Sequence, residues 1–156
     1  MGSPLSPVVA NLFMEVFESK ALSSTQFQLK LWKRFVDDTC VIWPHGQERL
    51  DLFLQHLNNQ SSSFKFTMEC EINGCLPFLD VFISKEEDDS FSHQVFQKKT
   101  HIEEYLNAKS HHFPTQNLRV LNTLAIRALR VSNEKHLDDE ITHLMNVFIS
   151  NGYSKN

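Results

Sequence analysis

The sequence predicts an α+β fold in which an antiparallel sheet, with helices on one face, is followed by a helical hairpin. Three observations predict this class. Apolar residues recur at three- and four-residue spacing in two segments of the N-terminal half, short β-branched and aromatic runs lie between and after those segments, and two more apolar stripes fill the C-terminal third. No internal repeat is present.

The N-terminal segment predicts a helix followed by a hairpin. Two prolines, Pro4 and Pro7, precede an apolar series whose spacing describes one face of a helix over about residues 7–20. The runs at 28–34 and 39–43 are rich in β-branched and aromatic residues. Because these runs flank Asp37 and Asp38, we expect a hairpin with both acids at its turn.

The middle of the chain predicts one helix and three strands. Leucine and phenylalanine recur at three and four positions over residues 47–57, as in an amphipathic helix. Residues 64–69 alternate with period two, and further strands are expected at 77–84 and 91–98, separated by an acidic loop at 85–89. This order suits one antiparallel sheet that lacks an opening strand.

The C-terminal third predicts two linked helices. Apolar stripes cover residues 118–129 and 137–148. Ser132 or Asn133 would cap the second helix, and Gly152 stands where helices commonly end. Two helices with so short a link form a helical hairpin.

Composition is that of a globular protein. The chain is 41% hydrophobic and 22% charged, which excludes wholesale disorder, and its 13 Phe residues indicate a real core. No apolar run approaches the ~20 residues that span a bilayer, and no signal-peptide pattern opens the sequence. We therefore expect an intracellular protein, nuclear or cytoplasmic, with no membrane contact.

Charge is distributed unevenly along the chain. The net charge of -4 is unusual for a nucleic-acid-binding protein. However, residues 1–90 hold 7 Lys/Arg against 13 Asp/Glu, whereas residues 91–156 hold 8 against 6. The C-terminal part is therefore the candidate for phosphate contacts, although a solvated basic face is the alternative for its lysines. The basic residues concerned are Lys98, Lys99, Lys109, Arg119, Arg127 and Arg130.

The Asp37-Asp38 pair is the main candidate for chemistry. Two carboxylates held close together repel each other unless a cation lies between them, and Mg²⁺ or Mn²⁺ prefers oxygen ligands. In a two-metal mechanism, one ion activates an attacking hydroxyl and the other stabilises the leaving pyrophosphate. Alone, such a pair more often marks a solvated turn. The neighbouring sequence decides between the two interpretations.

Two sequence blocks carry a resemblance to a known family. Residues 35–38, Phe-Val-Asp-Asp, resemble the (Tyr/Phe)-x-Asp-Asp signature of reverse transcriptases. They follow residues 2–7, Gly-Ser-Pro-Leu-Ser-Pro, which resemble an upstream block of the same enzymes. Residues 76–80 resemble the strand near the primer grip, and residues 99–112 resemble a segment of Penelope-like elements. The chain is thus similar, over nearly its whole length, to the reverse transcriptase of a Penelope-like (non-LTR type) retroelement.

This resemblance implies both an architecture and an activity. Residues 1–98 would be a partial polymerase palm whose first strand is missing, and residues 99–156 a connection and helical thumb, also described as helix-turn-helix. The activity implied is RNA-directed DNA polymerisation by two-metal nucleotidyl transfer. It would use an RNA template, a DNA primer, deoxynucleoside triphosphates and Mg²⁺ or Mn²⁺.

The same resemblance assigns the site residues. Asp37 would be the catalytic metal ligand and Asp38 the supporting acid. Glycine and proline suit a backbone that approaches a ligand closely in one conformation. A phenylalanine in place of the more common tyrosine should be tolerated because its ring packs against neighbours. The substrate pocket would be formed by Gly2, Ser3, Pro4 and Phe35.

Reverse transcriptases take a third catalytic aspartate from a strand before the Gly-Ser-Pro block, together with the fingers, and this sequence begins at that block. We therefore expect a truncated copy with little activity alone, because transition-state charge would be left uncompensated. The main alternative is a non-catalytic nucleic-acid-binding module, in which the hairpin of residues 115–151 does the binding. A zinc site from Cys70, Cys75, His101 and His111 matches no strong spacing pattern.

Overall fold

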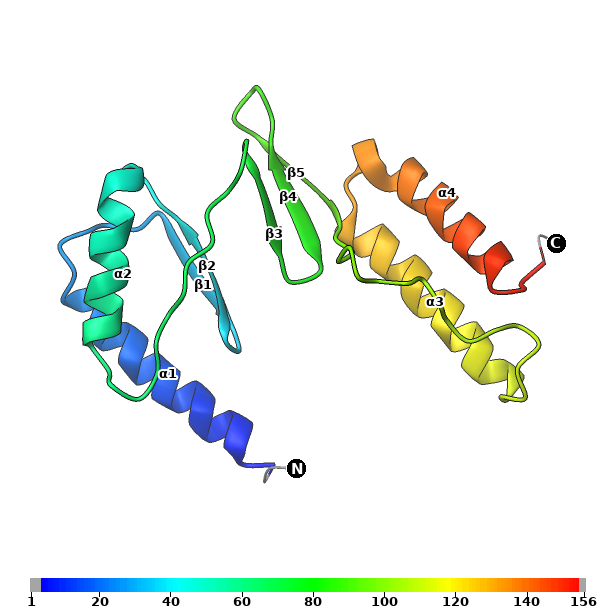
Figure 1. Cartoon of the computed structure of the whole chain (residues 1–156), viewed down its shortest axis with the longest axis horizontal. Coiled ribbons are helices and arrows are strands. Elements are labelled where there is room, and N and C mark those ends of the chain that lie inside the picture. Colours follow the sequence, from blue (N-terminus) through cyan, green and yellow to red (C-terminus); the bar gives the residue numbers. More distant parts are fainter. Residues whose placement is uncertain (1–3, 155–156) are drawn as a thin grey trace. The chain divides into compact units, whose positions relative to one another are not determined.

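The structure, a computed structural model, describes residues 4–154 (Figure 1). Within them the chain forms four α-helices and two small antiparallel sheets, so the predicted α+β class is confirmed. The chain divides into two compact units, the first ending at Glu69 and the second beginning at Cys70. The expectation of one continuous sheet is wrong, because each unit contains its own sheet. The boundary expected at residue 98 lies inside the second unit.

The first unit agrees closely with the predicted order of elements. Helix and hairpin predictions are confirmed, with a short 3-10 turn before the second helix. The two strands pair antiparallel with Phe35 opposite Asp38, which leaves a two-residue turn. The elements are α1 (Ser6–Ser23), β1 (Leu31–Phe35), β2 (Asp38–Ile42), η1 (Gln47–Arg49) and α2 (Leu50–Asn59).

An aromatic core holds the first unit together. Its buried residues are Phe17 and Ala21 on α1 and Phe53 and Leu57 on α2. Aromatic rings from the hairpin, from the residues on either side of it and from the segment after α2 pack around them in mostly edge-to-face pairs, each worth about 0.5–1.5 kcal/mol beyond its buried area. The surrounding rings are Phe27, Trp32, Trp43, Phe64 and Phe66.

Residues 64–69 form no strand, so that prediction is wrong. Their alternation is nevertheless real, because the rings of Phe64 and Phe66 lie 4.9 and 5.6 Å from that of Phe17. The backbone of Phe66 bonds to a side chain instead of a strand: Asn58 Oδ1 accepts its N–H at 2.7 Å and Asn58 Nδ2 donates to its carbonyl at 3.1 Å. A side-chain amide thus satisfies the groups that a partner strand would otherwise satisfy.

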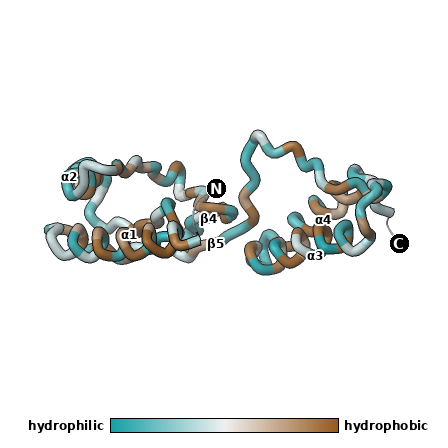
Figure 2. The backbone as a smooth tube through the Cα atoms, turned by 90° about the horizontal axis from the view of Figure 1, so that it is seen from below, coloured by the Kyte–Doolittle hydropathy of each residue, from teal (hydrophilic) through white to brown (hydrophobic). Residues whose placement is uncertain are grey.

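Most of the predicted apolar face of α1 is exposed. Phe17 is buried, but five large apolar side chains of the same helix are more than half exposed. Figure 2 shows hydrophobic residues along much of this helix. The five are Val8, Val9, Leu12, Phe13 and Val16.

The second unit begins with three antiparallel strands, β3 (Cys75–Phe78), β4 (Val81–Lys85) and β5 (Phe91–Val95), in that order in the sheet. The single strand expected at 77–84 is wrong. The chain reverses at Leu79-Asp80, where Leu79 has a φ of +55°, so that Pro77 pairs with Phe82. The strand expected at 91–98 also ends earlier, at Val95.

The helical hairpin is confirmed as α3 (Pro114–Val131) and α4 (Glu134–Ser150) (Figure 1). The end of α4 forms the predicted glycine stop. Gly152 has a φ of +86° and donates its N–H to the Ile149 carbonyl, while Tyr153 donates to that of Phe148. These two bonds define a Schellman motif, which is completed by contact between the Phe148 and Tyr153 rings at 6.2 Å.

Strand β5 is bonded to the link between α3 and α4, which explains why the predicted boundary at residue 98 falls inside a compact unit. Asn133 occupies the N-cap position of α4 without a side-chain capping bond, and its N–H donates to the His93 carbonyl at 2.9 Å. His93 Nδ1 lies 2.6 Å from the Val131 carbonyl oxygen. Among the described residues, no helix has both the length and the apolar composition needed to cross a membrane.

Candidate functional site

The two acids lie at the tip of the β1–β2 hairpin. Asp37 is in the two-residue turn and Asp38 is the first residue of β2, and both are exposed. The other turn residue, Val36, has a φ of +56°. This region is unfavourable for a β-branched side chain and costs on the order of 1–3 kcal/mol. The hairpin therefore presents both carboxylates to solvent from a strained turn.

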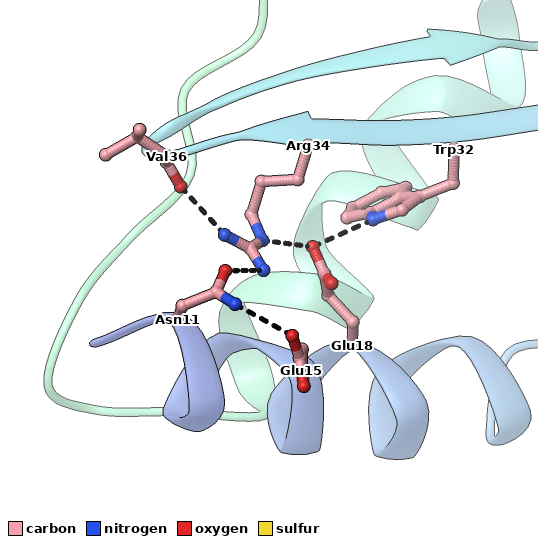
Figure 3. Close-up of polar contacts among 6 residues, drawn as sticks. All are labelled: Asn11, Glu15, Glu18, Trp32, Arg34 and Val36. Atoms are coloured by element: carbon pink, nitrogen blue, oxygen red, sulfur yellow. Dashed lines mark hydrogen bonds and ion pairs between the residues drawn. The ribbon is translucent and has the colours of Figure 1, made fainter. Parts of the chain in front are cut away.

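The side chain of Arg34 connects this turn to α1 (Figure 3). Its Nε lies 2.7 Å from Glu18 Oε1, its Nη2 donates to Asn11 Oδ1 at 2.9 Å, and its Nη1 donates to the Val36 carbonyl at 3.2 Å. The side chains of Arg34 and Glu18 are only 9% and 15% exposed, so solvent screens this ion pair weakly. We call Asn11, Glu18 and Arg34 the turn clamp.

Two more residues support the turn clamp. Trp32 Nε1 donates to Glu18 Oε1 at 3.0 Å, so that this one oxygen accepts from the side chains of both Trp32 and Arg34. On the helix, Asn11 Nδ2 donates to Glu15 Oε1 at 2.8 Å, which orients the amide so that its oxygen faces Arg34. Figure 3 shows both bonds. Asn11 lies five residues after Ser6, about 7.5 Å along the helix axis, so the turn is attached near the start of α1.

The carboxylate pair has the ligand chemistry that hard divalent cations prefer. Within residues 4–154, no group of three or more His, Cys, Asp or Glu side chains is placed to hold a metal ion. Mg²⁺, however, usually keeps several waters and binds through one or two carboxylates together with substrate phosphates. Asp37 and Asp38 supply that number of carboxylates, and both residues are exposed.

The expected substrate-pocket residues are only partly described. Gly2 and Ser3 lie outside the described residues. Pro4 is exposed in the turn before α1. The expectation that the Phe35 ring packs against neighbours is wrong, because the residue is 60% exposed at the hairpin tip.

The basic residues of the second unit are concentrated on α3 and on the segment before it. Helix α3 holds three arginines and no acid, whereas α4 holds four acids and one lysine. At 100° per residue, Arg119 and Arg130 lie within about 20° of each other on one face of α3, and both are exposed. Arg127 is less available, because its Nη2 donates to the Phe96 carbonyl at 3.1 Å and lies 3.5 Å from Asp80 Oδ1.

The lysines belong to the irregular segment between β5 and α3. Lys98, Lys99 and Lys109 are all exposed there. The segment is held against the end of α4 by buried Asn151, which is 8% exposed. Asn151 Oδ1 accepts from the Tyr105 N–H at 2.9 Å. In addition, its Nδ2 donates to the Glu103 carbonyl at 3.0 Å, its own carbonyl accepts from Ala108, and Tyr153 Oη donates to the Leu106 carbonyl.

Sequence reasoning missed the turn clamp and Asn151. A signal for the clamp was present, since Trp32 and Arg34 are two residues apart on one strand and therefore share a face. Asn11 and Glu18 are seven residues apart, which places them on one side of a helix. For Asn151, the only local signal is its position directly before the helix-ending glycine.

Residues 104–156 match the family model of the animal helix-turn-helix domain. The match begins in the segment held by Asn151 and includes α3 and α4, and it spans roughly a third of the chain. The helical hairpin of the structure agrees with this match. No curated protein and no solved structure matches the chain.

Proposed function

We propose that this chain is a segment of a reverse transcriptase of Penelope-like type. The first unit together with β3–β5 would be the palm portion that carries the metal-binding turn, and α3–α4 the thumb. The observation that carries the proposal is the position of Asp37 and Asp38 at the tip of a hairpin that is fixed to the helix following the Gly-Ser-Pro block. This placement supports the resemblance of residues 35–38 to the (Tyr/Phe)-x-Asp-Asp signature.

The residues of this chain would act mainly by positioning and charge. Asp37 and Asp38 would hold Mg²⁺ or Mn²⁺, and the bound ions would activate a primer hydroxyl and stabilise the departing pyrophosphate. Pro4 and Phe35 would lie beside the substrate, at the helix start and the hairpin tip. The turn clamp would keep the carboxylates in one orientation, which lowers the entropic cost of bringing the reactants together.

The template–primer duplex would bind to the basic side of the second unit. Its phosphates would contact Arg119 and Arg130 on α3, with Lys98, Lys99 and Lys109 contributing from the preceding segment and Arg127 mainly joining α3 to the strands. In helix-turn-helix proteins the second helix usually enters the major groove. Here the second helix is acidic, so we expect the first helix to face the duplex and to contact phosphates rather than base edges.

A second candidate is a non-catalytic nucleic-acid-binding module. The match of residues 104–156 to a helix-turn-helix domain favours it, because that match includes the basic helix and excludes the acids of the hairpin. Under this hypothesis the chain binds nucleic acid and Asp37-Asp38 is a solvated turn.

Metal binding by the full chain separates the two candidates. We propose a titration with Mn²⁺ followed by electron paramagnetic resonance, comparing the parent with Asp37→Asn, Asp38→Asn. A matched control is Asp138→Asn, Asp139→Asn, because this second adjacent pair is also exposed but lies on α4. We expect at least tenfold weaker Mn²⁺ binding in the first variant only. Equal binding by all three proteins, with duplex binding intact, would favour the non-catalytic module.

Primer extension on an RNA template tests catalysis directly with the same proteins. The resemblance leads us to expect little extension by the chain alone. Extension that is present in the parent and lost in Asp37→Asn, Asp38→Asn would overturn that expectation and assign the activity to this turn.

A further inference from the structure

The hairpin tip has few apolar contacts to hold it in place. Phe35 and Val36 are 60% and 70% exposed, and a two-stranded hairpin alone is at best marginally stable. The tip is instead attached through the guanidinium of Arg34, whose three nitrogens each contact a different acceptor. One acceptor, the Val36 carbonyl, belongs to the turn itself, directly before Asp37.

From this geometry we infer that Asn11, Glu18 and Arg34 are positioning residues for a divalent cation at Asp37 and Asp38. Asn11 and Glu18 hold Arg34, Arg34 holds the Val36 carbonyl, and the turn is thereby fixed relative to α1, which lowers the cost of ordering the two carboxylates around the ion. The inference rests on the proposed function, because it requires the cation site.

Such a clamp would lower the cost of bringing two like charges to one ion. Two like charges at the tip of a free turn move apart, and gathering them around an ion then costs conformational entropy. Val36 also has an unfavourable φ of +56°, so the turn would tend to relax if its carbonyl were released. Bonds from Arg34 to Asn11 and to the Val36 carbonyl oppose both changes.

Only arginine has the geometry for this role. Its planar guanidinium presents donors in several fixed directions, whereas a lysine ammonium is a compact point charge on a flexible stem. A lysine at position 34 would keep the attraction to Glu18 and lose the simultaneous bonds to Asn11 and Val36. Arg34→Lys therefore separates the positioning role from the buried charge pair.

The test measures Mn²⁺ affinity and unfolding temperature for the full chain. The variants are Arg34→Lys, Asn11→Ala and their combination, with Arg49→Lys as control because Arg49 is an exposed arginine of the same unit. Groups that orient metal ligands typically change affinity by 10–100-fold. We expect Arg34→Lys to weaken Mn²⁺ binding about tenfold and Asn11→Ala several-fold, each with a nearly unchanged unfolding temperature.

The combined variant provides a readout that a purely structural role would not give. If Asn11 acts through Arg34, Mn²⁺ affinity in the combination should equal that of Arg34→Lys alone. Asn11 is exposed, so Asn11→Ala still decides the matter if Arg34→Lys lowers the unfolding temperature. Mn²⁺ binding that is lost in Asp37→Asn, Asp38→Asn and unchanged in all clamp variants would overturn this inference alone. Mn²⁺ binding that does not depend on the two aspartates would overturn the proposed function as well.

Discussion

The two compact units are stabilised by different kinds of contact. The buried side chains of the first unit are apolar, and aromatic rings surround them. The second unit has a small apolar core of Ala128, Leu144 and Val147, and all four residues described as buried and polar belong to it: Ser92, Asn117, Ser132 and Asn151. In both units, however, polar bonds rather than ring packing fix the segments that carry candidate chemistry. The aromatic core supplies stability to the first unit, and in both units hydrogen bonds fix the backbone beside the candidate residues.

The largest expected effect would come from opening the aromatic core. Phe17 is 8% exposed and contacts the rings of Phe64 and Phe66, so Phe17→Ala should lower the free energy of unfolding by about 3–5 kcal/mol. Urea unfolding followed by circular dichroism measures this loss. Phe13→Ala is the matched control on the same helix, because Phe13 is 53% exposed, and it should cost about 1 kcal/mol or less. Equal losses would contradict the assignment of Phe17, rather than its neighbour Phe13 on the same face, to the core.

A smaller but more local effect is expected at the polar centre of the second unit. Asn151→Ala removes the acceptor of the Tyr105 N–H and the donor to the Glu103 carbonyl, and should cost about 2–3 kcal/mol. Hydrogen exchange should show faster exchange of the Tyr105 amide. Asn146→Ala, at an exposed position of the same helix, should be neutral or slightly stabilising. Unchanged protection of Tyr105 would show that Asn151 does not hold the basic segment.

If the basic face of α3 contacts phosphates, its arginines should contribute to the salt dependence of duplex binding. Replacing Arg119 and Arg130 by glutamine should remove about two phosphate contacts, and so reduce the slope of log affinity against log salt by roughly two. Fluorescence anisotropy with a labelled RNA–DNA hybrid measures the slope. Lys135→Gln is the control, since Lys135 lies on the mainly acidic α4 and is already paired with Glu86. An unchanged slope in the double variant would place the duplex elsewhere.

The smallest expected effect concerns pH. Burial raises the pKa of Glu140, and the nearby Glu103 carboxylate adds to this, whereas His143 and Arg127 oppose it. The folded state therefore holds this proton more tightly than the unfolded state, so the contribution of Glu140 to stability is present below the ordinary glutamate pKa of about 4.3. It is lost as pH rises through the raised pKa of the folded state.

Glu140→Gln should accordingly raise the unfolding temperature slightly at pH 7, and the gain should disappear in acid, below that ordinary pKa. Thermal unfolding at both pH values tests the sign. Glu104→Gln, at an exposed position of the same unit, should show no such pH-dependent difference. A gain that grows on acidification would contradict the direction of the Glu140 shift.

Local signals predicted the helices, the first hairpin and the glycine stop at Gly152, because periodicity and turn chemistry depend on neighbouring residues. The errors in strand prediction arose where the structure depends on contacts with residues distant in the sequence. The alternation at residues 64–69 arises because Phe64 and Phe66 contact Phe17. The same alternation is expected with or without a neighbouring strand. The chain reverses within the apolar run at 77–84. This reversal was not predicted, because the residue with the positive φ is Leu79 and not a typical turn residue.

The candidate site likewise has one part that was predicted from local sequence and one part that was not. A motif of adjacent residues located Asp37 and Asp38 at a turn, and the structure confirms that placement. Their support comes from Asn11 and Glu18, which are 23 and 16 residues from Arg34. Their contact with Arg34 is evident only from the structure, in which the hairpin packs against α1.

The exposed apolar side of α1 has a practical consequence for such measurements. A fully folded sample should bind a hydrophobic dye strongly at room temperature, a response usually attributed to a molten globule. High starting fluorescence in a dye-based melting assay would then report this helix rather than loss of structure. Circular dichroism and hydrogen exchange avoid the ambiguity, because neither relies on a probe that seeks hydrophobic surface.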